Sequence, residues 1–272
     1  MTGARGYLGR AFVRAGYHEL SCDVTSVNYV EREITCTKPD MVLHLAGKSN
    51  PAYCQQHEEV SSRINVGGTR NVVDVCEKYK IPFILLSSSQ IWGGGWRDAF
   101  NKHAEDSSFT TAVNNYGVQK LVAEMATVTA NIGWDGAKVI RTSYVFDRTR
   151  FAQELSSLAH GNHIDAPAFL KRSFIYLSDF VELVQDYCTR FDDMPSVLHL
   201  AGSKTASYCE FWIEVCEQLG FYPYLVNCRN VEKDGYAARR PHNGGLDVSL
   251  SKKLGFRQTD YIEGIRRMKN EG

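Results

Sequence analysis

The stretch that decides the fold is Pro82-Phe83-Ile84-Leu85-Leu86-Ser87-Ser88-Ser89, an apolar run that ends in three serines. A short run without polar interruption is typical of a strand that is buried on both faces of a sheet. Residues 41–47 form a second apolar run, and residues 138–143 are a third predicted strand. Helical patterns between these strands predict a parallel sheet covered by helices. Because ligands bind at the carboxyl ends of such strands, the serines mark the expected binding edge.

Helical patterns fill much of the remaining chain. The predicted helices cover residues 10–14, 27–35, 58–79, 116–130 and 208–219. Residues 18–22 are predicted to form a short strand. In the last helix, Phe211, Trp212, Val215 and Cys216 recur at helical spacing, which predicts the core of a smaller lobe.

Three glycines open the chain in Thr2-Gly3-Ala4-Arg5-Gly6-Tyr7-Leu8-Gly9. Glycines at such a turn permit positive φ and let a phosphate approach the amide groups of a helix N-terminus. A turn of this kind should follow a buried strand, yet only Met1 precedes Thr2. We therefore expect the first strand to be missing or truncated. Either the given start is incomplete, or the fold is trimmed and has a reduced cofactor affinity.

Composition limits the partners and the compartment. The 272 residues carry 31 Lys and Arg against 31 Asp and Glu, with no long run of one sign. This balance gives no reason to expect nucleic acid or an anionic membrane as a partner. The longest apolar stretch, at 81–86, is too short to span a bilayer. The eight cysteines show no Cys-x-x-Cys and no His/Cys clustering, which predicts reduced thiols in a cytoplasmic protein and no metal site.

Tyr116 and Lys120 are the candidate proton-transfer pair. They are four residues apart, so a helix brings both side chains to one face. A nearby ammonium group favours the phenolate and should lower the pKa of the tyrosine from about 10. The alternative is a tyrosine that is merely half-buried on its helix, because this spacing also arises by chance.

Five ordered motifs resemble the extended short-chain dehydrogenase/reductases, which act on nucleotide-diphosphate sugars with NAD or NADP. The motifs are Thr2-Gly3-Ala4-Arg5-Gly6-Tyr7-Leu8-Gly9, His44-Leu45-Ala46-Gly47, Asn65-Val66-Gly67-Gly68-Thr69-Arg70-Asn71-Val72, Ser87-Ser88-Ser89-Gln90-Ile91-Trp92-Gly93 and Tyr116-x-x-x-Lys120. The resemblance implies an α/β, Rossmann-type doubly wound parallel sheet with a smaller C-terminal substrate-binding lobe. The expected NAD(P)-binding domain covers 1–147 with a return segment at about 174–200, and the smaller lobe covers 148–173 and 201–272.

The resemblance also implies roles for single residues. Tyr116 resembles the proton donor, Lys120 the residue that holds the cofactor ribose, and Ser88 the partner of the reacting oxygen. Ser89 is the alternative to Ser88 if the register shifts by one, and Asn65 is expected to link a helix to the sheet. The implied cofactor-binding residues are Gly3, Arg5, Gly6, Tyr7, Leu8, Asp23, Leu45, Ala46, Gly47, Tyr116, Lys120 and Ser143.

The cofactor preference and the substrate follow from further residues of the resemblance. Asp23 aligns with an aspartate beside the adenine, and Arg5 could meet a 2′-phosphate, which favours NADP over NAD. Arg172, in Arg-Ser-Phe-Ile-Tyr-Leu-Ser-Asp, and Arg240, in Arg-Pro-His-Asn, resemble the diphosphate ligands of sugar-nucleotide enzymes. Their alternative role is that of surface or salt-bridging arginines. Ser88 and Ser89 complete the implied substrate site.

Three activities remain open within the resemblance. The chain looks most like the dTDP-4-dehydrorhamnose reductases, which implies reduction of a 4-keto-6-deoxy nucleotide-diphosphate sugar with Tyr116 as proton donor. Dehydration is disfavoured because Ser89-Gln90 stand where the dehydratases carry Asp-Glu. A nucleotide-sugar 4-epimerase is one alternative. A non-catalytic regulatory relative, similar to the beta subunit of methionine adenosyltransferase, is another. A homodimer is compatible with the resemblance.

Overall fold

The structure is a computed structural model that describes residues 1–93, 102–107, 112–229 and 238–270. Its larger part is a parallel four-stranded sheet in the order β1-β2-β3-β7. These strands are β1 (Val42–His44), β2 (Phe83–Ser88), β3 (Ala137–Thr142) and β7 (Val197–His199). Every residue of β1, β2 and β3 is buried, as expected for strands with both faces covered. The predicted α/β fold with a parallel sheet is confirmed.

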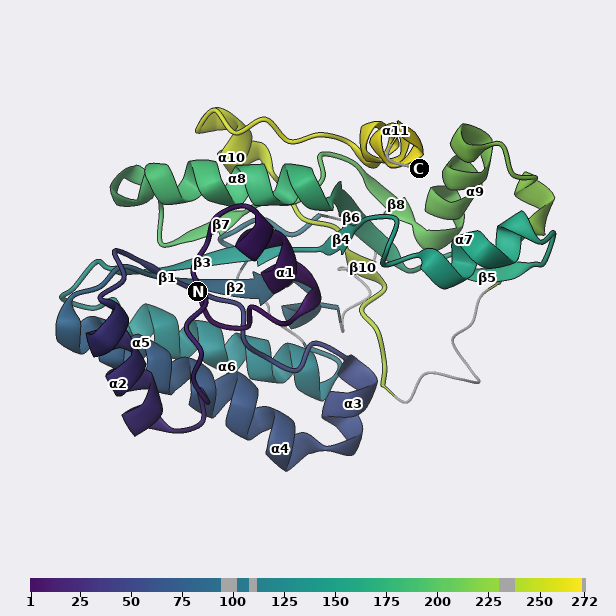
Figure 1. Cartoon of the computed structure of the whole chain (residues 1–272). Helices are drawn as coiled ribbons and strands as arrows, with labels where there is room; N and C mark the ends of the chain where they lie inside the picture. Colours follow the sequence, from purple (N-terminus) through teal and green to yellow (C-terminus); the bar gives the residue numbers. More distant parts are fainter. Residues whose placement is uncertain (94–101, 108–111, 230–237, 271–272) are drawn as a thin grey trace.

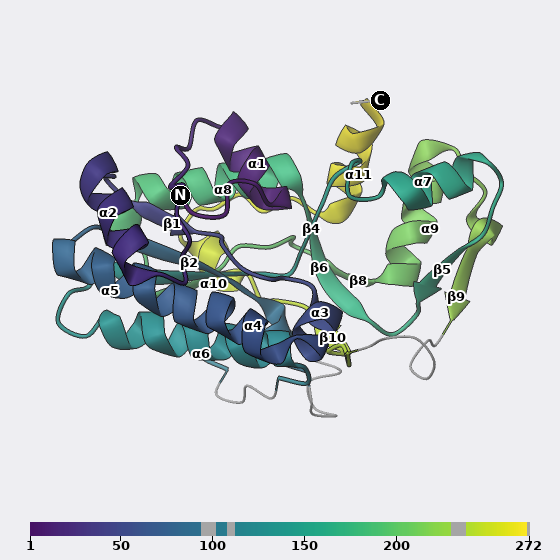
Figure 2. The same cartoon turned by 60° about the horizontal axis from the view of Figure 1, so that its bottom comes forward.

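Helices cover both faces of this sheet (Figures 1 and 2). One face carries α1 (Tyr7–Arg14) and α8 (Leu177–Thr189), and the other carries α2 (Val27–Thr37), α5 (Thr69–Tyr79) and α6 (Asn115–Ala130). Apolar side chains fill the space between each helix layer and the sheet. The helices α3 (Pro51–Gln56) and α4 (Glu58–Ser62) continue the second layer.

The predicted helix at 58–79 is not a uniform α-helix. It runs as α4, then a π-helical segment (Arg63–Gly68), then α5. A π-helical turn holds one extra residue and is often found at functional sites. It carries Asn65 into the interior, where the side chain is buried.

A smaller lobe lies beside the sheet (Figure 1). Its strands are β4 (Tyr144–Phe146), β5 (Ile164–Pro167), β6 (Lys171–Tyr176), β8 (Thr205–Ser207), β9 (Val226–Arg229) and β10 (Asn243–Gly244). Its helices are α7 (Ala152–Ala159), α9 (Tyr208–Leu219) and α11 (Tyr261–Asn270), whereas α10 (Ser249–Lys253) packs beside β7 of the larger part. The helix predicted at 208–219 has these same bounds, and its apolar residues pack in an aromatic core. The residue bounds proposed for the two lobes stay a prediction.

The chain start forms only a remnant of the expected first strand. Thr2 makes a single parallel bridge with His44, and its amide donates to the Leu43 carbonyl. On the other side, the Leu20 amide donates to the Met1 carbonyl at 2.7 Å. The strand predicted at 18–22 is wrong, because this segment has too short a neighbour to form a ladder of hydrogen bonds.

The predicted state of the cysteines is also partly wrong. Cys209 and Cys228 form a disulfide that joins α9 to β9. Cysteine spacing could not reveal this pair, because only the folded lobe brings two positions 19 residues apart into contact. The other six cysteines are free thiols. Within the described residues, no helix is long and apolar enough to cross a membrane.

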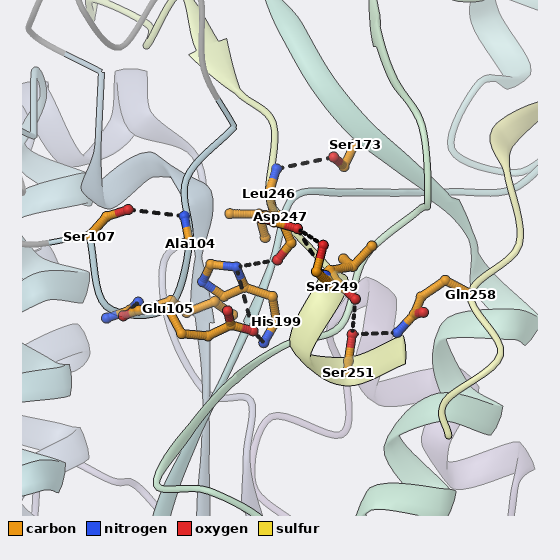
Figure 3. Close-up of polar contacts among 12 residues, drawn as sticks. Ala104, Glu105, Ser107, Ser173, His199, Leu246, Asp247, Ser249, Ser251 and Gln258 are labelled. Atoms are coloured by element: carbon orange, nitrogen blue, oxygen red, sulfur yellow. Dashed lines mark hydrogen bonds and ion pairs between the residues drawn. The ribbon is translucent and has the colours of Figure 1, made fainter. Parts of the chain in front are cut away.

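A buried polar network fixes the chain that follows β10 (Figure 3). His199 Nδ1 donates to the Asp247 carbonyl at 2.9 Å, and the His199 amide donates to Glu105 Oε1 at 3.0 Å. The Leu246 amide donates to Ser173 Oγ at 3.1 Å, which ties the same segment to β6. These bonds connect the residues that follow β10 to both lobes. They therefore also restrain the segment before β10, which carries Arg240.

His199 is expected to make the fold acid-sensitive. Burial lowers its pKa from 6.5 to about 3, so the unfolded chain takes up a proton between these values while the folded chain does not. Stability should therefore fall as the pH drops below 6.5, with His199 accounting for about 2 kcal/mol by pH ~5. The measurement is the free energy of unfolding in urea above pH ~6.5 and at pH ~5, for the wild type and for His199→Asn. The asparagine keeps a donor for the Asp247 carbonyl.

The variant should lose less stability than the wild type on acidification. His160→Asn, at an exposed position, is the matched control and should behave like the wild type. An equal loss in the wild type and in His199→Asn would contradict the assignment.

Candidate functional site

A cavity of about 500 Å³ opens at the carboxyl ends of β1, β2 and β3. Its wall combines the glycine turn, the strand ends, one face of α6 and residues of the smaller lobe. The lining residues that matter below are Gly3, Gly6, Tyr7, Leu8, Leu45, Gly47, Ser88, Tyr116, Lys120, Ser143, Tyr144, Arg150, Arg172, Tyr208 and Arg240. Most of the residues proposed from the sequence therefore share one cavity.

Helix α6 carries Tyr116 and Lys120 into this cavity. Asn114 caps the helix, with its Oδ1 accepting from the Gly117 amide at 2.9 Å. Gly117 lies so close to the turn after β2 that a Cβ atom there would stand 2.2 Å from the Gln90 carbonyl oxygen. The absence of a side chain at Gly117 thus lets α6 approach the end of β2.

An ion pair fixes the next turns of the same helix. Arg141 on β3 binds Glu124 on α6 with two nitrogens, and the shorter contact, from Nη2, is 2.7 Å. Both side chains are buried, and this fork-like arrangement sets the angle of the helix as well as its position. Tyr116 and Lys120 therefore lie on a rigid element.

Ser88, the last residue of β2, faces Tyr116. Both residues line the cavity, the Ser88 side chain acts on the pKa of the Tyr116 hydroxyl, and Ser88 Oγ accepts from the Gln90 amide at 3.2 Å. Ser89 lies in another direction, because its Oγ donates to Ser143 Oγ at 3.3 Å and the residue does not line the cavity. Of the two serines, the structure thus brings Ser88 next to the tyrosine.

The expected lowering of the tyrosine pKa is wrong for this arrangement. Burial raises the pKa of Tyr116 to about 12, and the Ser88 side chain opposes that rise. Burial likewise lowers the pKa of Lys120 to about 8. The Lys120 amine donates to the Leu86 carbonyl at 2.8 Å, so it is bonded to β2. At neutral pH the phenol keeps its proton and the amine is mostly charged, which suits Tyr116 to act as an acid.

Asn65 links the loop after β1 to helix α6, as its position in the motif suggested. Its Oδ1 accepts from the Lys48 amide at 2.6 Å, and its Nδ2 donates to Gln119 Oε1 at 2.7 Å. Gly47 makes room for this side chain, since a Cβ atom there would stand 2.9 Å from Asn65 Oδ1. The π-helical turn therefore fixes the distance between the loop after β1 and helix α6, which form two neighbouring walls of the cavity.

The glycine turn forms a floor without side chains. Gly3 has φ +74°, and a Cβ atom there would stand 2.6 Å from the Ala46 amide nitrogen, so this position requires glycine. Gly6, Tyr7 and Leu8 continue the lining to the N-terminus of α1. A cradle of this shape fits the phosphates of a dinucleotide.

Three of the proposed cofactor residues do not line the cavity. Arg5 is exposed, and its Nε lies 3.7 Å from Glu19. Asp23 is exposed as well and accepts from the Thr25 amide and hydroxyl. Ala46 contacts the glycine turn through its backbone, and its amide donates to the Thr2 hydroxyl. Their proposed roles stay predictions.

The opposite wall carries the two arginines proposed from the sequence. Arg172 is buried, and its Nη1 donates to the Lys171 and Pro241 carbonyls at 2.5 and 3.0 Å. The segment of Arg240 is held from two sides. Gly93 packs against Pro241 so closely that a Cβ atom there would stand 2.0 Å from Pro241 Cβ, and Asn114 Nδ2 donates to the Arg239 carbonyl.

Sequence reasoning missed Tyr144, Arg150 and Tyr208, which also line the cavity. Tyr144 follows Ser143 at the end of a predicted strand, which is only a weak indication that it lines a binding site. Tyr208 was identified only as the first residue of a predicted helix, and Arg150 has no motif around it. Among the described residues, no group of three or more His, Cys, Asp or Glu side chains could hold a metal ion.

Comparison with known proteins agrees with this architecture. The probable low-salt glycan biosynthesis reductase Agl14 of Haloferax volcanii is 24% identical over 95% of this chain and 92% of its own length. Methionine adenosyltransferase 2 subunit beta of Mus musculus is 22% identical over 98% of this chain and 85% of its own. The crystal structure of dTDP-4-dehydrorhamnose reductase from Bacillus anthracis in complex with NADP superposes with a TM-score of 0.87. It is 19% identical and covers 100% of this chain and 98% of that one.

The family model described as the RmlD substrate binding domain matches residues 1–272. This match spans the glycine turn, the helix of Tyr116 and Lys120, and the smaller lobe. The chain therefore belongs to the RmlD substrate binding domain family, and its resemblance to extended short-chain dehydrogenase/reductases of the dTDP-4-dehydrorhamnose reductase type is confirmed.

Proposed function

We propose that this protein is an NAD(P)-dependent reductase of a 4-keto-6-deoxy nucleotide-diphosphate sugar. One observation carries the proposal. Ser88, Tyr116 and Lys120 line one cavity, whose described lining holds four cationic side chains and no carboxylate. The cations are Lys120, Arg150, Arg172 and Arg240. Such a cavity favours ligands with several negative charges, as a dinucleotide and a nucleotide-diphosphate sugar both have.

The glycine turn and Lys120 are the residues that would hold the cofactor. A bound NADPH or NADH would supply the hydride. The B. anthracis structure contains NADP, which supports the preference for NADP, with Arg5 as the proposed ligand of the 2′-phosphate. Arg5 is exposed, so its guanidinium group is accessible to a phosphate at the rim of the glycine turn.

Tyr116 is the proposed proton donor to the sugar oxygen. Its raised pKa keeps the phenol protonated, and a hydrogen bond donated by Ser88 would stabilise the phenolate that remains after the proton has left. Burial dominates the pKa of Tyr116 before the reaction, and the positive charge of Lys120 in the same cavity is proposed to stabilise the phenolate that forms during proton transfer. Arg172 and Arg240 are the proposed ligands of the sugar nucleotide's diphosphate, since guanidinium groups engage two oxygens at once.

A regulatory, non-catalytic role is the second candidate. The similarity to methionine adenosyltransferase 2 subunit beta over 98% of this chain favours it. Retention of Ser88, Tyr116 and Lys120 around one cavity supports the enzyme instead. Titration of NADPH and NADH by fluorescence, followed by assay with a 4-keto-6-deoxy nucleotide sugar, separates the two. Binding of neither cofactor would favour the regulatory role, and interconversion of UDP-glucose and UDP-galactose would favour a 4-epimerase.

We also propose a homodimer, and a cytoplasmic location for it. Helix α6 is unusual because its charged residues, Lys120 and Glu124, are buried while its exposed residues are mostly apolar. The exposed apolar residues are Val118, Val122, Met125 and Val128. An uncharged apolar stripe on a surface helix marks an interaction site, and the same stripe on a second copy is complementary to it.

Tyr116→Phe should abolish most turnover while leaving cofactor binding nearly intact. The change removes the proton donor but keeps the ring, so kcat should fall about 10²- to 10⁴-fold. The Kd for NADPH should stay within about twofold, because the hydroxyl contributes little ground-state binding energy. Tyr222→Phe, at an exposed position on the smaller lobe, is the matched control and should keep full activity. A variant at position 116 that retains most of its rate would show that another group donates the proton.

The rate of reduction should fall above pH about 8. Lys120 is charged below its pKa and neutral above it, so at higher pH the phenolate formed on Tyr116 loses its compensating cation. The profile of kcat/KM against pH should therefore descend, by about tenfold per pH unit in its steep part. Lys120→Arg stays charged throughout and should lack this descent, whatever its absolute rate. A wild-type profile that stays flat to about pH 9.5 would contradict the role of Lys120.

The double variant Val122→Lys with Met125→Lys should convert a dimer to a monomer. The new ammonium groups would meet their own copies across the two-fold axis, and burying them unpaired is unfavourable. Sedimentation velocity at matched concentrations measures the change. Val13→Lys, an exposed apolar position on α1, should leave the dimer intact. A wild-type monomer, or a double variant that remains dimeric, would refute this interface.

A further inference from the structure

Arg150 occupies an unusual place in the cavity wall. Its guanidinium carbon lies 4.9 Å from the ring centre of Tyr7 and 4.7 Å from that of Tyr144. Two aromatic rings therefore hold one cation, an arrangement that orders the guanidinium plane without neutralising its charge. The residue is exposed and lines the cavity, so an anion can reach it.

The protein leaves most of this guanidinium's donors unused. Nε donates to the Tyr144 hydroxyl at 3.1 Å. The neighbouring carboxylate of Asp147 instead accepts from the Arg150 backbone amide and from the Thr149 hydroxyl. Within the described residues, Arg150 forms no ion pair with a carboxylate. Its two terminal nitrogens are thus available to a ligand, and together they match a pair of phosphate oxygens.

The position of Arg150 separates it from the other two arginines. Tyr7 is the first residue of α1 and belongs to the glycine turn, so Arg150 lies at the phosphate-binding end of the cavity. Arg172 is bonded to the Pro241 carbonyl, and its guanidinium carbon lies 6.0 Å from the ring centre of Tyr208. The rings of Tyr208 and Tyr144 are 5.4 Å apart, and they lie between the two cations.

We propose that Arg150 binds the diphosphate of the dinucleotide cofactor, opposite the amide groups of the glycine turn. This inference rests on the proposed function, because it assumes that the cavity takes a dinucleotide. It assigns to Arg150 a role that no motif of the sequence indicates. The two ends of the cavity then have separate cations: Arg150 serves the cofactor, and Arg172 with Arg240 serves the sugar nucleotide.

Arg150→Gln tests this assignment through binding alone. The Kd for NADPH, measured by fluorescence, should rise about 10- to 100-fold, as expected when charge-assisted hydrogen bonds are lost. Arg150→Lys keeps the charge but not the planar pair of donors, so its Kd for NADPH should lie between that of the wild type and that of Arg150→Gln. Arg148→Gln removes an exposed arginine two residues away and should bind like the wild type. Equal melting temperatures of the variants exclude misfolding as the cause.

The choice of ligand locates the contact. ADP-ribose, which contains the diphosphate, should lose affinity for Arg150→Gln in the same proportion as NADPH. Adenosine 2′-monophosphate lacks the diphosphate and should bind the variant and the wild type equally. Titration of UDP and dTDP by calorimetry should show no change for Arg150→Gln and a clear loss for Arg240→Ala.

Three results would overturn the assignment. An unchanged Kd for NADPH in Arg150→Gln would show that Arg150 does not bind the cofactor. A loss confined to UDP and dTDP would move Arg150 to the sugar-nucleotide end. A wild-type protein that binds neither NADPH nor NADH would refute this inference together with the proposed function. Cofactor binding without turnover of keto sugars would refute the reaction alone, and the Arg150 test would remain decisive.

Discussion

The fold and the site both depend on the close contact between helix α6 and the end of strand β2. Gly117 permits the approach, and the Lys120 amine bonds to the Leu86 carbonyl across it. The contact has an energetic cost. Lowering the pKa of a lysine from 10.5 to about 8 corresponds to about 3 kcal/mol of unfavourable free energy for its charged form. The packing of α6 against the sheet and the Arg141–Glu124 ion pair offset this unfavourable free energy and hold the helix in place.

Much of the architecture could be predicted from the sequence because its signals are local. The apolar run at 83–88 and its neighbours indicate a parallel sheet, since strands buried on both faces cannot alternate polar and apolar residues. Helix α9 begins with a capping box formed by Ser207 and Glu210 and ends at Gly220 in the left-handed conformation. These local devices explain why its predicted bounds agree with the structure. The common cavity of Ser88, Tyr116 and Lys120 follows from strand ends and helical spacing.

What could not be predicted depends on distant parts of the chain meeting. The pKa of Tyr116 is set by burial, which the four-residue spacing to Lys120 does not report. Arg150 contacts Tyr7, 143 positions earlier, and no motif connects the two. The Cys209–Cys228 disulfide likewise appears only when α9 and β9 lie side by side. In each case, the sequence contains the residues but not the distance between them.

The π-helical turn at Arg63–Gly68 has a consequence for how this chain can vary. Its additional residue rotates the following helix by about 100° relative to an uninterrupted α-helix. Loss of a single residue here would leave a regular helix of good hydrogen bonds, yet it would turn Asn65 away from Lys48 and Gln119. The same rotation would turn the buried side chains of α5, such as Val72 and Val73, away from the sheet, and the spacing between the loop after β1 and the helix that carries Tyr116 would be lost. At this turn, the length of the chain constrains the protein more strongly than the identity of most side chains.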